Sequence, residues 1–317
     1  MKKPHATRPG SPRRPVRPAL RAAFAAALAG GLLATPAYAL TFNVSYGSSV
    51  TNASNAATIE QAFNDAISFY QNTFTNNVTI NLNVGWGYVG STQIASGALG
   101  ESSFSETTTN FSTLQGVLPS TALPLSDPTN GGSIYLSFAN ARVLGLLPRA
   151  YRSALDGSVG FDSTANWTFD PTQRAQSGAY DFIGVAEHEI SEVLGRYSAL
   201  PGQESVLDLY RYSAANTLDT TGASAYFSTD RGVTKSYYFN GNASAGDLGD
   251  WTGQSNDAFN YGIPAGTELK VSATDRQEMA SLGYTLAAPV PEPAEAALMV
   301  AGLGLLGWRA RRGPRGS

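Results

Sequence analysis

One mostly apolar segment, Tyr180–Arg196, places the strongest constraint on what this chain can be. It reads YDFIGVAEHEISEVLGR, and its apolar spacing predicts a helix that ends near Gly195. Residues four apart lie on one face of a helix, so His188 and Glu192 point the same way, with Glu189 beside them. This is the layout of the H-E-x-x-H zinc motif with a carboxylate in place of the second imidazole. The segment therefore predicts a metal-binding helix.

Two interpretations of this helix compete. In the first it is an ordinary helix with a solvated acidic face, on which His188 is a common polar residue. In the second the charges are buried, and a cation lies among them. Three acids (Glu187, Glu189 and Glu192) crowd one imidazole within an apolar run, which is costly unless a cation offsets their repulsion. We favour the metal site.

The composition is that of a folded protein without thiol chemistry. Of the 317 residues, 42% are hydrophobic and 14% are charged, which is not the composition of a disordered tail. The chain has no cysteine, so disulfides, thiolate metal sites and cysteine nucleophiles are excluded. A metal ion would have to bind imidazole, carboxylate or backbone oxygen.

The formal net charge of −3 hides an acidic body between two basic ends. Residues 40–288 contain 10 Lys and Arg against 22 Asp and Glu. Seven of the other basic residues lie in the first 21 positions and four follow Trp308. An acidic body without a basic stripe argues against nucleic acid as a partner.

The N-terminal segment, residues 1–39, has the three parts of a secretory signal peptide. A long basic region precedes the apolar run Ala22–Leu33, and Ala37-Tyr38-Ala39 is a small-x-small cleavage site. We expect export and a mature chain that begins near Leu40, which leaves His188 as its only histidine.

The C-terminal segment, residues 289–317, contains Val290–Pro293, the apolar stretch Ala296–Trp308 and a final arginine cluster. The apolar stretch is shorter than the roughly 20 residues of a stable membrane span. A plain C-terminal membrane anchor is one interpretation. Pro-Glu-Pro, a short span and terminal arginines also resemble the PEP-CTERM sorting signal. That resemblance implies a Gram-negative bacterium, transient membrane contact, and removal of the tail by exosortase before the protein reaches the cell surface or the medium.

Residues 40–288 are long enough for one domain with its own core. Besides the central helix, the periodicity predicts helices over 56–73, 139–147 and 272–282. It predicts strands over 41–50, 78–84, 133–138 and 158–161, and a hairpin over 226–239. The polar residues 91–130 are expected to form surface loops, with a short helix near 114–123. Residues 205–213 read as a strand in which Asp208 is either exposed or a ligand. The mixture predicts an α+β fold.

The order of these elements resembles the zincin metallopeptidases, above all the metzincins, whose pattern is H-E-x-x-H-x-x-G-x-x-H or D. His188, Glu189 and Gly195 match it in position. The segments DFIGVAEHEISEVLGR, LDLYRYS, YFSTDRG and SATDRQEMASLGY are also similar to predicted PEP-CTERM metalloproteases. The resemblance implies a twisted mixed sheet, an active-site helix, a loop-rich C-terminal subdomain, a zinc ion, and Glu189 as general base.

The chain departs from the metzincin pattern at two ligand positions. Glu192 replaces the second histidine, which zinc tolerates because it accepts carboxylate oxygen. Ser198 stands at the third ligand position, so another residue must supply that ligand. We predict Asp208, with Glu204 as the second choice. The predicted zinc ligands are therefore His188, Glu192 and Asp208.

These features predict an exported zinc-dependent endopeptidase that acts on a protein or peptide substrate, with Tyr210 or Arg211 stabilising the oxyanion. A second hypothesis is a non-catalytic surface or matrix protein that retains the zincin fold. A third is calcium-dependent adhesion through Asp247, Asp250 and Asp257, which lie among glycines and asparagines.

Overall fold

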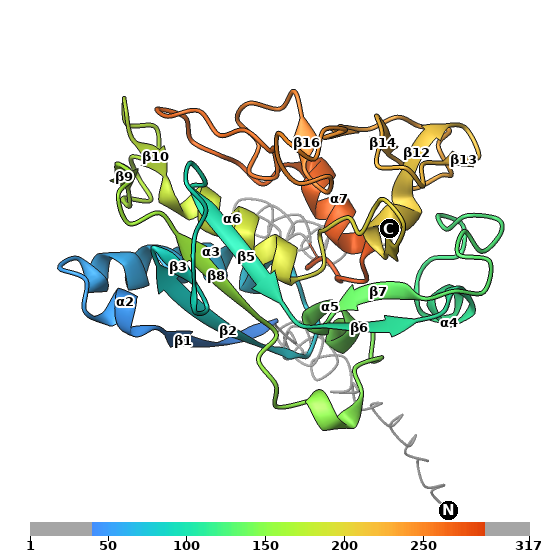
Figure 1. Cartoon of the computed structure of the whole chain (residues 1–317), viewed down its shortest axis with the longest axis horizontal. Helices are drawn as coiled ribbons and strands as arrows, with labels where there is room; N and C mark the ends of the chain where they lie inside the picture. The colour runs from blue at the N-terminus through green and yellow to red at the C-terminus, as the bar shows by residue number, and fades with distance from the viewer. Residues whose placement is uncertain (1–39, 289–317) are drawn as a thin grey trace, which may run out of the picture. The chain divides into compact units, whose positions relative to one another are not determined.

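The structure of the chain is a computed structural model that describes residues 40–288, and it is a mixed α+β fold (Figure 1). The predicted signal peptide and sorting tail lie outside the described residues. Between residues 40 and 288, no helix combines the length and the apolar character that a membrane crossing requires.

The central sheet has four strands in the order β1-β2-β8-β5. Their bounds are β1 Thr41–Tyr46, β2 Thr79–Trp86, β8 Gly157–Phe161 and β5 Gly100–Phe104. β1, β2 and β8 are parallel, whereas β5 runs antiparallel to β8. Apolar residues alternate along β2 and are buried, as expected for a strand in the middle of a sheet. The result is a mixed sheet with β5 at its edge.

Two helices, α3 (Ala56–Thr73) and α6 (Phe182–Val193), pack against each other beside this sheet. α3 buries an amphipathic face that includes Ile59, Phe63 and Tyr70. The Tyr70 hydroxyl donates a hydrogen bond to the backbone carbonyl of Glu187, which ties α3 to α6. In Figure 1, α6 runs beside β5, and the orange C-terminal segments lie on its other side.

The segment after α6 consists of short strands, turns and one longer helix. Its five-stranded sheet has the order β13 (Thr217–Leu218), β12 (Arg211–Ala214), β14 (Tyr226–Phe227), β15 (Tyr238–Phe239) and β16 (Trp251–Thr252). The helix α7 (Ala273–Ser281) begins with a capping box between Ser272 and Asp275. Trp251 is fully buried, and its indole N–H donates to Asp275 at 2.7 Å.

The remaining elements are short. A three-stranded sheet has the order β11 (Glu204–Ser205), β7 (Ile134–Ser137) and β6 (Glu106–Thr109). The other helices and strands are α2 (Ser48–Thr51), α4 (Phe111–Val117), α5 (Phe138–Val143), η2 (Arg149–Tyr151), η3 (Leu207–Tyr210), β3 (Tyr88–Val89), β4 (Thr92–Gln93), β9 (Trp167–Thr168) and β10 (Tyr180–Asp181).

The structure confirms the predicted helix over 56–73 and corrects three other segments. The strand predicted over 41–50 ends at Tyr46, and Ser48–Thr51 form the helix α2. Residues 91–130 are not only loops with a short helix: they contain β5 and β6, whose polar sequences pair through the backbone with β8 and β7. Residues 205–213 are not one strand, because a 3-10 helix separates β11 from β12. Periodicity missed β5 because the sequence GESSF lacks an alternating apolar face.

Gly160 in β8 lies under the backbone of β3, and a Cβ atom there would overlap the carbonyl group of Tyr88. We expect Gly160→Ala to lower the free energy of unfolding by about 1–3 kcal/mol, because the added methyl group would displace the backbone of β3. Gly116→Ala is the matched control, since no heavy atom lies within 4 Å of its added Cβ. Urea unfolding of both variants tests this, and equal midpoints would contradict it.

Candidate metal centre

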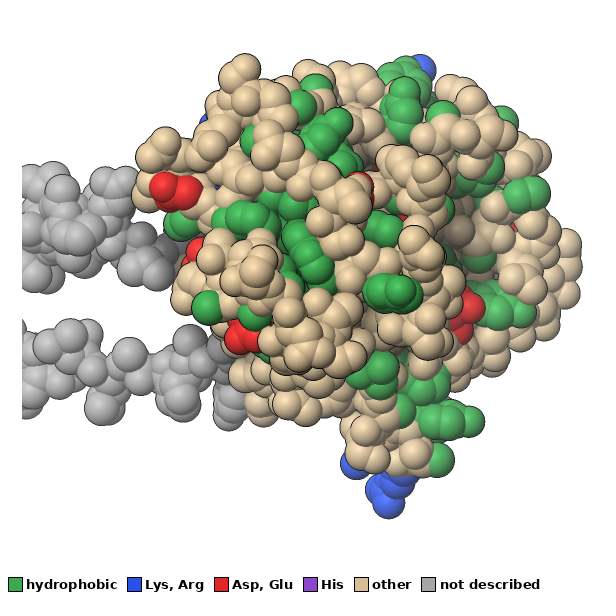
Figure 2. Space-filling view, turned by 60° about the vertical axis from the view of Figure 1, so that its left-hand side comes forward, with side chains coloured by type: hydrophobic (Ala, Val, Ile, Leu, Met, Phe, Trp, Pro, Cys, Tyr) green, Lys and Arg blue, Asp and Glu red, His purple; other side chains and the backbone are tan. Residues whose placement is uncertain are grey.

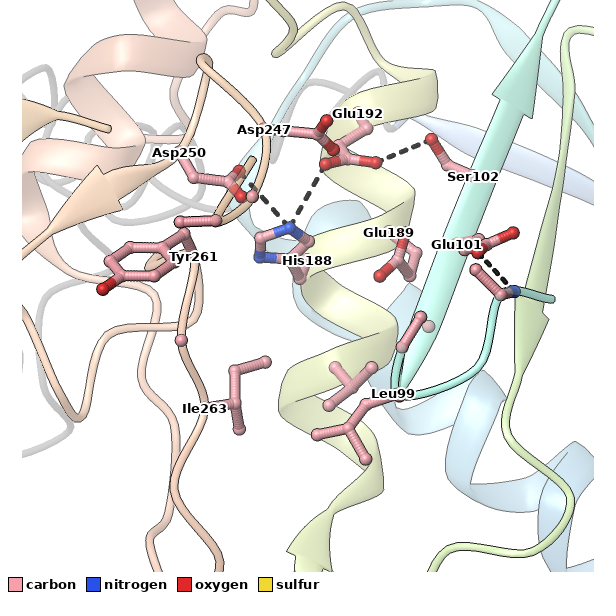
Figure 3. Close-up of a pocket in the computed structure, with 18 of the residues that line it drawn as sticks. Leu99, Glu101, Ser102, His188, Glu189, Glu192, Asp247, Asp250, Tyr261 and Ile263 are labelled. Atoms are coloured by element: carbon pink, nitrogen blue, oxygen red, sulfur yellow. Dashed lines mark hydrogen bonds and ion pairs between the residues drawn. The ribbon is translucent and has the colours of Figure 1, made fainter. Parts of the chain in front are cut away.

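α6 places His188, Glu189 and Glu192 in the interior. Their exposed fractions are 6%, 5% and 6%, so the interpretation of a solvated acidic face is wrong. Asp181 is the N-cap of the helix, and its carboxylate accepts a hydrogen bond from the N–H of Gly184 at 3.3 Å. The register of the helix then turns the imidazole and the Glu192 carboxylate toward the same point (Figure 3).

The imidazole of His188 is fixed by hydrogen bonds at both nitrogens. Nδ1 lies 2.7 Å from the carbonyl oxygen of Ala258, which can only accept, so Nδ1 carries a proton. Nε2 lies 3.2 Å from Oε1 of Glu192 and 3.4 Å from Oδ1 of Asp250. A hydrogen-bonded Nδ1 and an Nε2 that faces carboxylates form the arrangement seen in metal-ligating histidines.

Asp250, immediately before β16, is the third side chain that meets this point. His188, Glu192 and Asp250 each offer one donor atom, and the three atoms lie within 4.8 Å of one another. Tetrahedral zinc with bonds of roughly 2.0–2.2 Å places its donor atoms roughly 3.3–3.6 Å apart. The two distances from Nε2, 3.2 and 3.4 Å, are close to that spacing. One imidazole and two carboxylates, all within 4.8 Å of one another, therefore form a donor set that zinc can accept.

The structure does not bring Asp208 to this cluster, and Asp250 takes the place expected for it. Asp208 is fully buried in η3, where its carboxylate accepts from Ser198 Oγ at 2.6 Å and from the N–H groups of Ala199 and Ser205 at 2.9 and 2.8 Å. With its oxygens committed to these donors, Asp208 organises the loop after α6. Glu204, the second choice for the third ligand, lies in β11 opposite Ile134 of β7 and is also outside the cluster.

Arg196 is a resident cation behind the cluster. Its side chain is fully buried, and Nη1 donates to Asp250 Oδ1 at 2.7 Å and to the carbonyl of Gly249 at 3.2 Å. Nε donates to Ser191 Oγ at 2.6 Å. Nη2 lies 3.2 Å from His188 Nε2 and 3.6 Å from Oε1 of Glu192. The guanidinium therefore orients Asp250 and touches all three candidate ligands.

The pKa values show that this point attracts positive charge. Burial alone would lower the pKa of His188, but the charges of Asp250 and Glu192 raise it to about 10. Burial would raise the pKa of Glu192, but contacts with His188, Arg196 and Ser102 lower it to about 2. The field that retains a proton on Nε2 would equally attract a metal cation.

The count of buried charges points the same way. With a neutral imidazole, the carboxylates of Glu189, Glu192 and Asp250 and the guanidinium of Arg196 leave a net charge of −2. A divalent cation would cancel it. Without one, the repulsion must be relieved by protonation, and burial together with the charge of Glu192 indeed raises the pKa of Glu189 well above its usual value.

The cluster faces a cleft of about 980 Å³. One wall is β5, where Ser102 Oγ donates to Oε2 of Glu192 at 2.7 Å and Gly100 passes close to Glu189. A Cβ on residue 100 would lie 2.8 Å from Cγ of Glu189, so only glycine allows this approach. The other wall is formed by the segment that carries Asp247, Asp250, Tyr261 and Ile263 (Figure 3).

Several other candidate residues have structural partners instead. The Tyr210 hydroxyl donates to the carbonyl of Ser281 at 2.8 Å, and the buried Arg211 contacts Leu248, Ala223 and Asp219. Neither lines the cleft, so neither is placed to stabilise an oxyanion there. Glu187, the third acid near His188, pairs with Arg174 at 3.3 Å.

The three aspartates considered as calcium ligands do not form one site. Asp250 belongs to the cluster with His188, and Asp247 lies beside Glu192, whose charge, together with burial, raises the Asp247 pKa to about 7. Asp257 instead accepts a hydrogen bond from the N–H of Phe259 at 2.8 Å. Within residues 40–288, the cluster of His188, Glu192 and Asp250 is the one acid- and histidine-rich group with metal-ligand spacing.

Sequence reasoning named Asp250 only as a calcium ligand, and it overlooked the contacts of Arg196. No local spacing connects Asp250 to the helix, because the two meet only through the packing of the C-terminal segment. Arg196 did carry a signal: an arginine one residue after the glycine that ends a metal-binding helix stays close to that helix.

The metal content of variants distinguishes Asp250 from Asp208 as the third ligand. We expect Asp250→Asn to reduce bound zinc from about one ion per chain to nearly none, because a neutral amide is a poor third ligand. Asp208→Asn should keep the metal and lower the free energy of unfolding by about 1–3 kcal/mol, because its hydrogen-bond donors lose a charged acceptor. Mass spectrometry of the metal after dialysis tests this, and the opposite pattern would restore Asp208 as the ligand.

Removal of the Arg196 side chain should destabilise the fold when no metal is bound. Arg196→Met leaves the buried carboxylate of Asp250 without its cation. We therefore expect the free energy of unfolding to fall by about 3–5 kcal/mol in the presence of chelator. Arg149→Met, at an exposed site, should change stability by less than about 0.5 kcal/mol. Denaturant titrations in which the two variants behave alike would show that Arg196 does not balance this charge.

Comparisons of the chain with protein-family models, with curated proteins and with solved structures gave no significant match.

Proposed function

We propose that this protein is an exported zinc-dependent endopeptidase with a zincin-type fold. The observation that carries the proposal is the convergence of His188, Glu192 and Asp250 at the floor of a cleft, with Glu189 beside them. Three protein ligands leave one zinc position for water or substrate, which distinguishes catalytic from structural zinc sites.

The fold gives the proposal a second support. β5 is an edge strand, antiparallel to its neighbour, and it borders the cleft next to the candidate ligands. An extended peptide can add to such an edge through backbone hydrogen bonds, with its side chains pointing alternately toward and away from the cleft. That position would bring a peptide bond close to Glu189.

The chemistry assigns a distinct part to each residue. A bound zinc ion would act as a Lewis acid for the peptide carbonyl and for a water molecule. His188, Glu192 and Asp250 would hold the ion. Glu189, outside this ligand set, would accept the proton of the attacking water and pass it to the leaving amine. In the cluster without a cation, burial and the charge of Glu192 raise the pKa of Glu189, which makes its carboxylate a stronger base; a bound divalent cation would favour the ionised form that can accept the proton.

The test removes the base without removing the metal. We expect Glu189→Gln to lower the hydrolysis of a casein substrate by at least about a hundredfold, since general-base catalysis contributes roughly 10²–10⁴. The variant should still bind about one zinc ion. Glu60→Gln, which lies on α3 outside the cleft, is the matched control and should retain activity. Hydrolysis that survives both Glu189→Gln and a chelator would refute the proposal.

A non-catalytic surface protein with the same fold is the second candidate, and the position of Arg196 favours it. The guanidinium already balances part of the cluster charge, and two carboxylate ligands make a zinc-bound water less acidic than imidazoles would. Bound zinc without hydrolysis across a broad peptide library would identify this function.

A further inference from the structure

A second cleft, of about 600 Å³, lies outside the metal centre and shares no lining residue with it. It is formed where the turn between α2 and α3 meets the end of β2 and the loop that leads into β9. Its volume is within the roughly 300–1,000 Å³ of small-molecule sites. Figure 2 brings the α2 side of the molecule forward, where uncharged polar and hydrophobic side chains predominate.

Three aromatic rings of this cleft are half-buried and held from behind. Trp86, Trp167 and Phe169 all pack against Phe182, with ring centroids 6.2, 5.5 and 5.0 Å away. The indole N–H of Trp167 also donates to the carbonyl of Asp162 at 2.7 Å. The rings therefore have fixed orientations while part of their surface remains accessible.

The polar side chains of the cleft have unused hydrogen-bonding capacity. Within residues 40–288, the exposed side chains of Asn52, Ser54 and Ser163 and the half-buried side chain of Asn55 make no hydrogen bond to other protein groups, whereas Ser49 Oγ accepts from the N–H of Trp86 at 3.0 Å. Asn55 is the clearest case: it is the N-cap residue of an 18-residue helix, yet its amide does not cap that helix. Amides and hydroxyls both donate and accept, so this set can satisfy a ligand that does the same.

We propose that this cleft binds a neutral oligosaccharide. The apolar C–H faces of a sugar ring stack on indole and phenyl rings, and its hydroxyl groups pair with amides and hydroxyls. No charged residue lines the cleft, although the body as a whole is strongly acidic, so nothing there would neutralise an ionic ligand. A wholly apolar ligand would cover the half-buried amide of Asn55 without pairing with it.

The site is independent of the proposed peptidase activity. Phe182 is the first residue of α6, and Trp167 contacts Tyr180 on the rim of the metal cleft, with ring centroids 6.2 Å apart. The two clefts are therefore connected through the packing of Trp167 on Tyr180 and Phe182, but their linings share no side chain. Sugar binding should persist in the presence of chelator and in Glu189→Gln.

The experiment is isothermal titration of the full chain with neutral tetrasaccharides of glucose, mannose, galactose and N-acetylglucosamine. A polygalacturonate tetramer and an uncharged tetrapeptide serve as alternative ligand classes. We expect at least one neutral sugar to bind, and Asn52→Ala with Asn55→Ala to weaken it at least tenfold. Asn77→Ala, an exposed asparagine outside the cleft, is the matched control.

Trp86→Leu should abolish binding, provided that its circular dichroism melt shows a folded protein; otherwise the asparagine variants decide. Binding of none of the neutral sugars at millimolar concentration would overturn the proposal. Equal affinity in the asparagine variants and in Asn77→Ala would also overturn it, as would a preference for the charged sugar or the peptide. Loss of hydrolysis in Glu189→Gln with sugar binding intact would separate this inference from the peptidase proposal.

Discussion

The structure depends on a cluster of charges that α6 carries into the interior. An imidazole, three carboxylates and a guanidinium lie together with almost no contact with solvent. Such a group is stable only when each charge has a partner, because the desolvation of an unpaired ion costs several kcal/mol. β5 provides one side through Ser102, and the segment before β16 provides the other through Asp250. The cluster thus links the central sheet to the C-terminal segment.

Arg196 connects the buried charges with one another. Its guanidinium holds Asp250 in place and reaches Nε2 of His188, so the candidate ligands are preorganised. His188, Glu192 and Asp250 would hold a cation beside this guanidinium, and the carboxylate of Glu189 would offset the added positive charge. The net negative charge of Glu189, Glu192, Asp250 and Arg196 together favours a divalent over a monovalent ion.

The two clefts differ in their chemical environment. The cleft beside His188 and Glu192 is acidic and is bordered by the edge strand β5, where the proposed peptidase would bind an extended peptide. The cleft behind Phe182 is uncharged and aromatic, which suits a polyhydroxylated ligand. The side chains of the first cleft are positioned by α6 and β5, whereas those of the second come mostly from turns and loops, with Trp86, Trp167 and Phe169 packed against Phe182 of α6.

The sequence by itself determined the local features. Helical periodicity defined 56–73, and the spacing of His188 and Glu192 on one helical turn required both to face one point. It also determined the mixed α+β class. Only the tertiary structure decided that Asp250 and not Asp208 completes the cluster, and that the polar segment of β5 is an edge strand. The physical reason is range: helix register is set by neighbours within four residues, whereas the third ligand and the strand pairing depend on contacts between segments that are far apart in the chain.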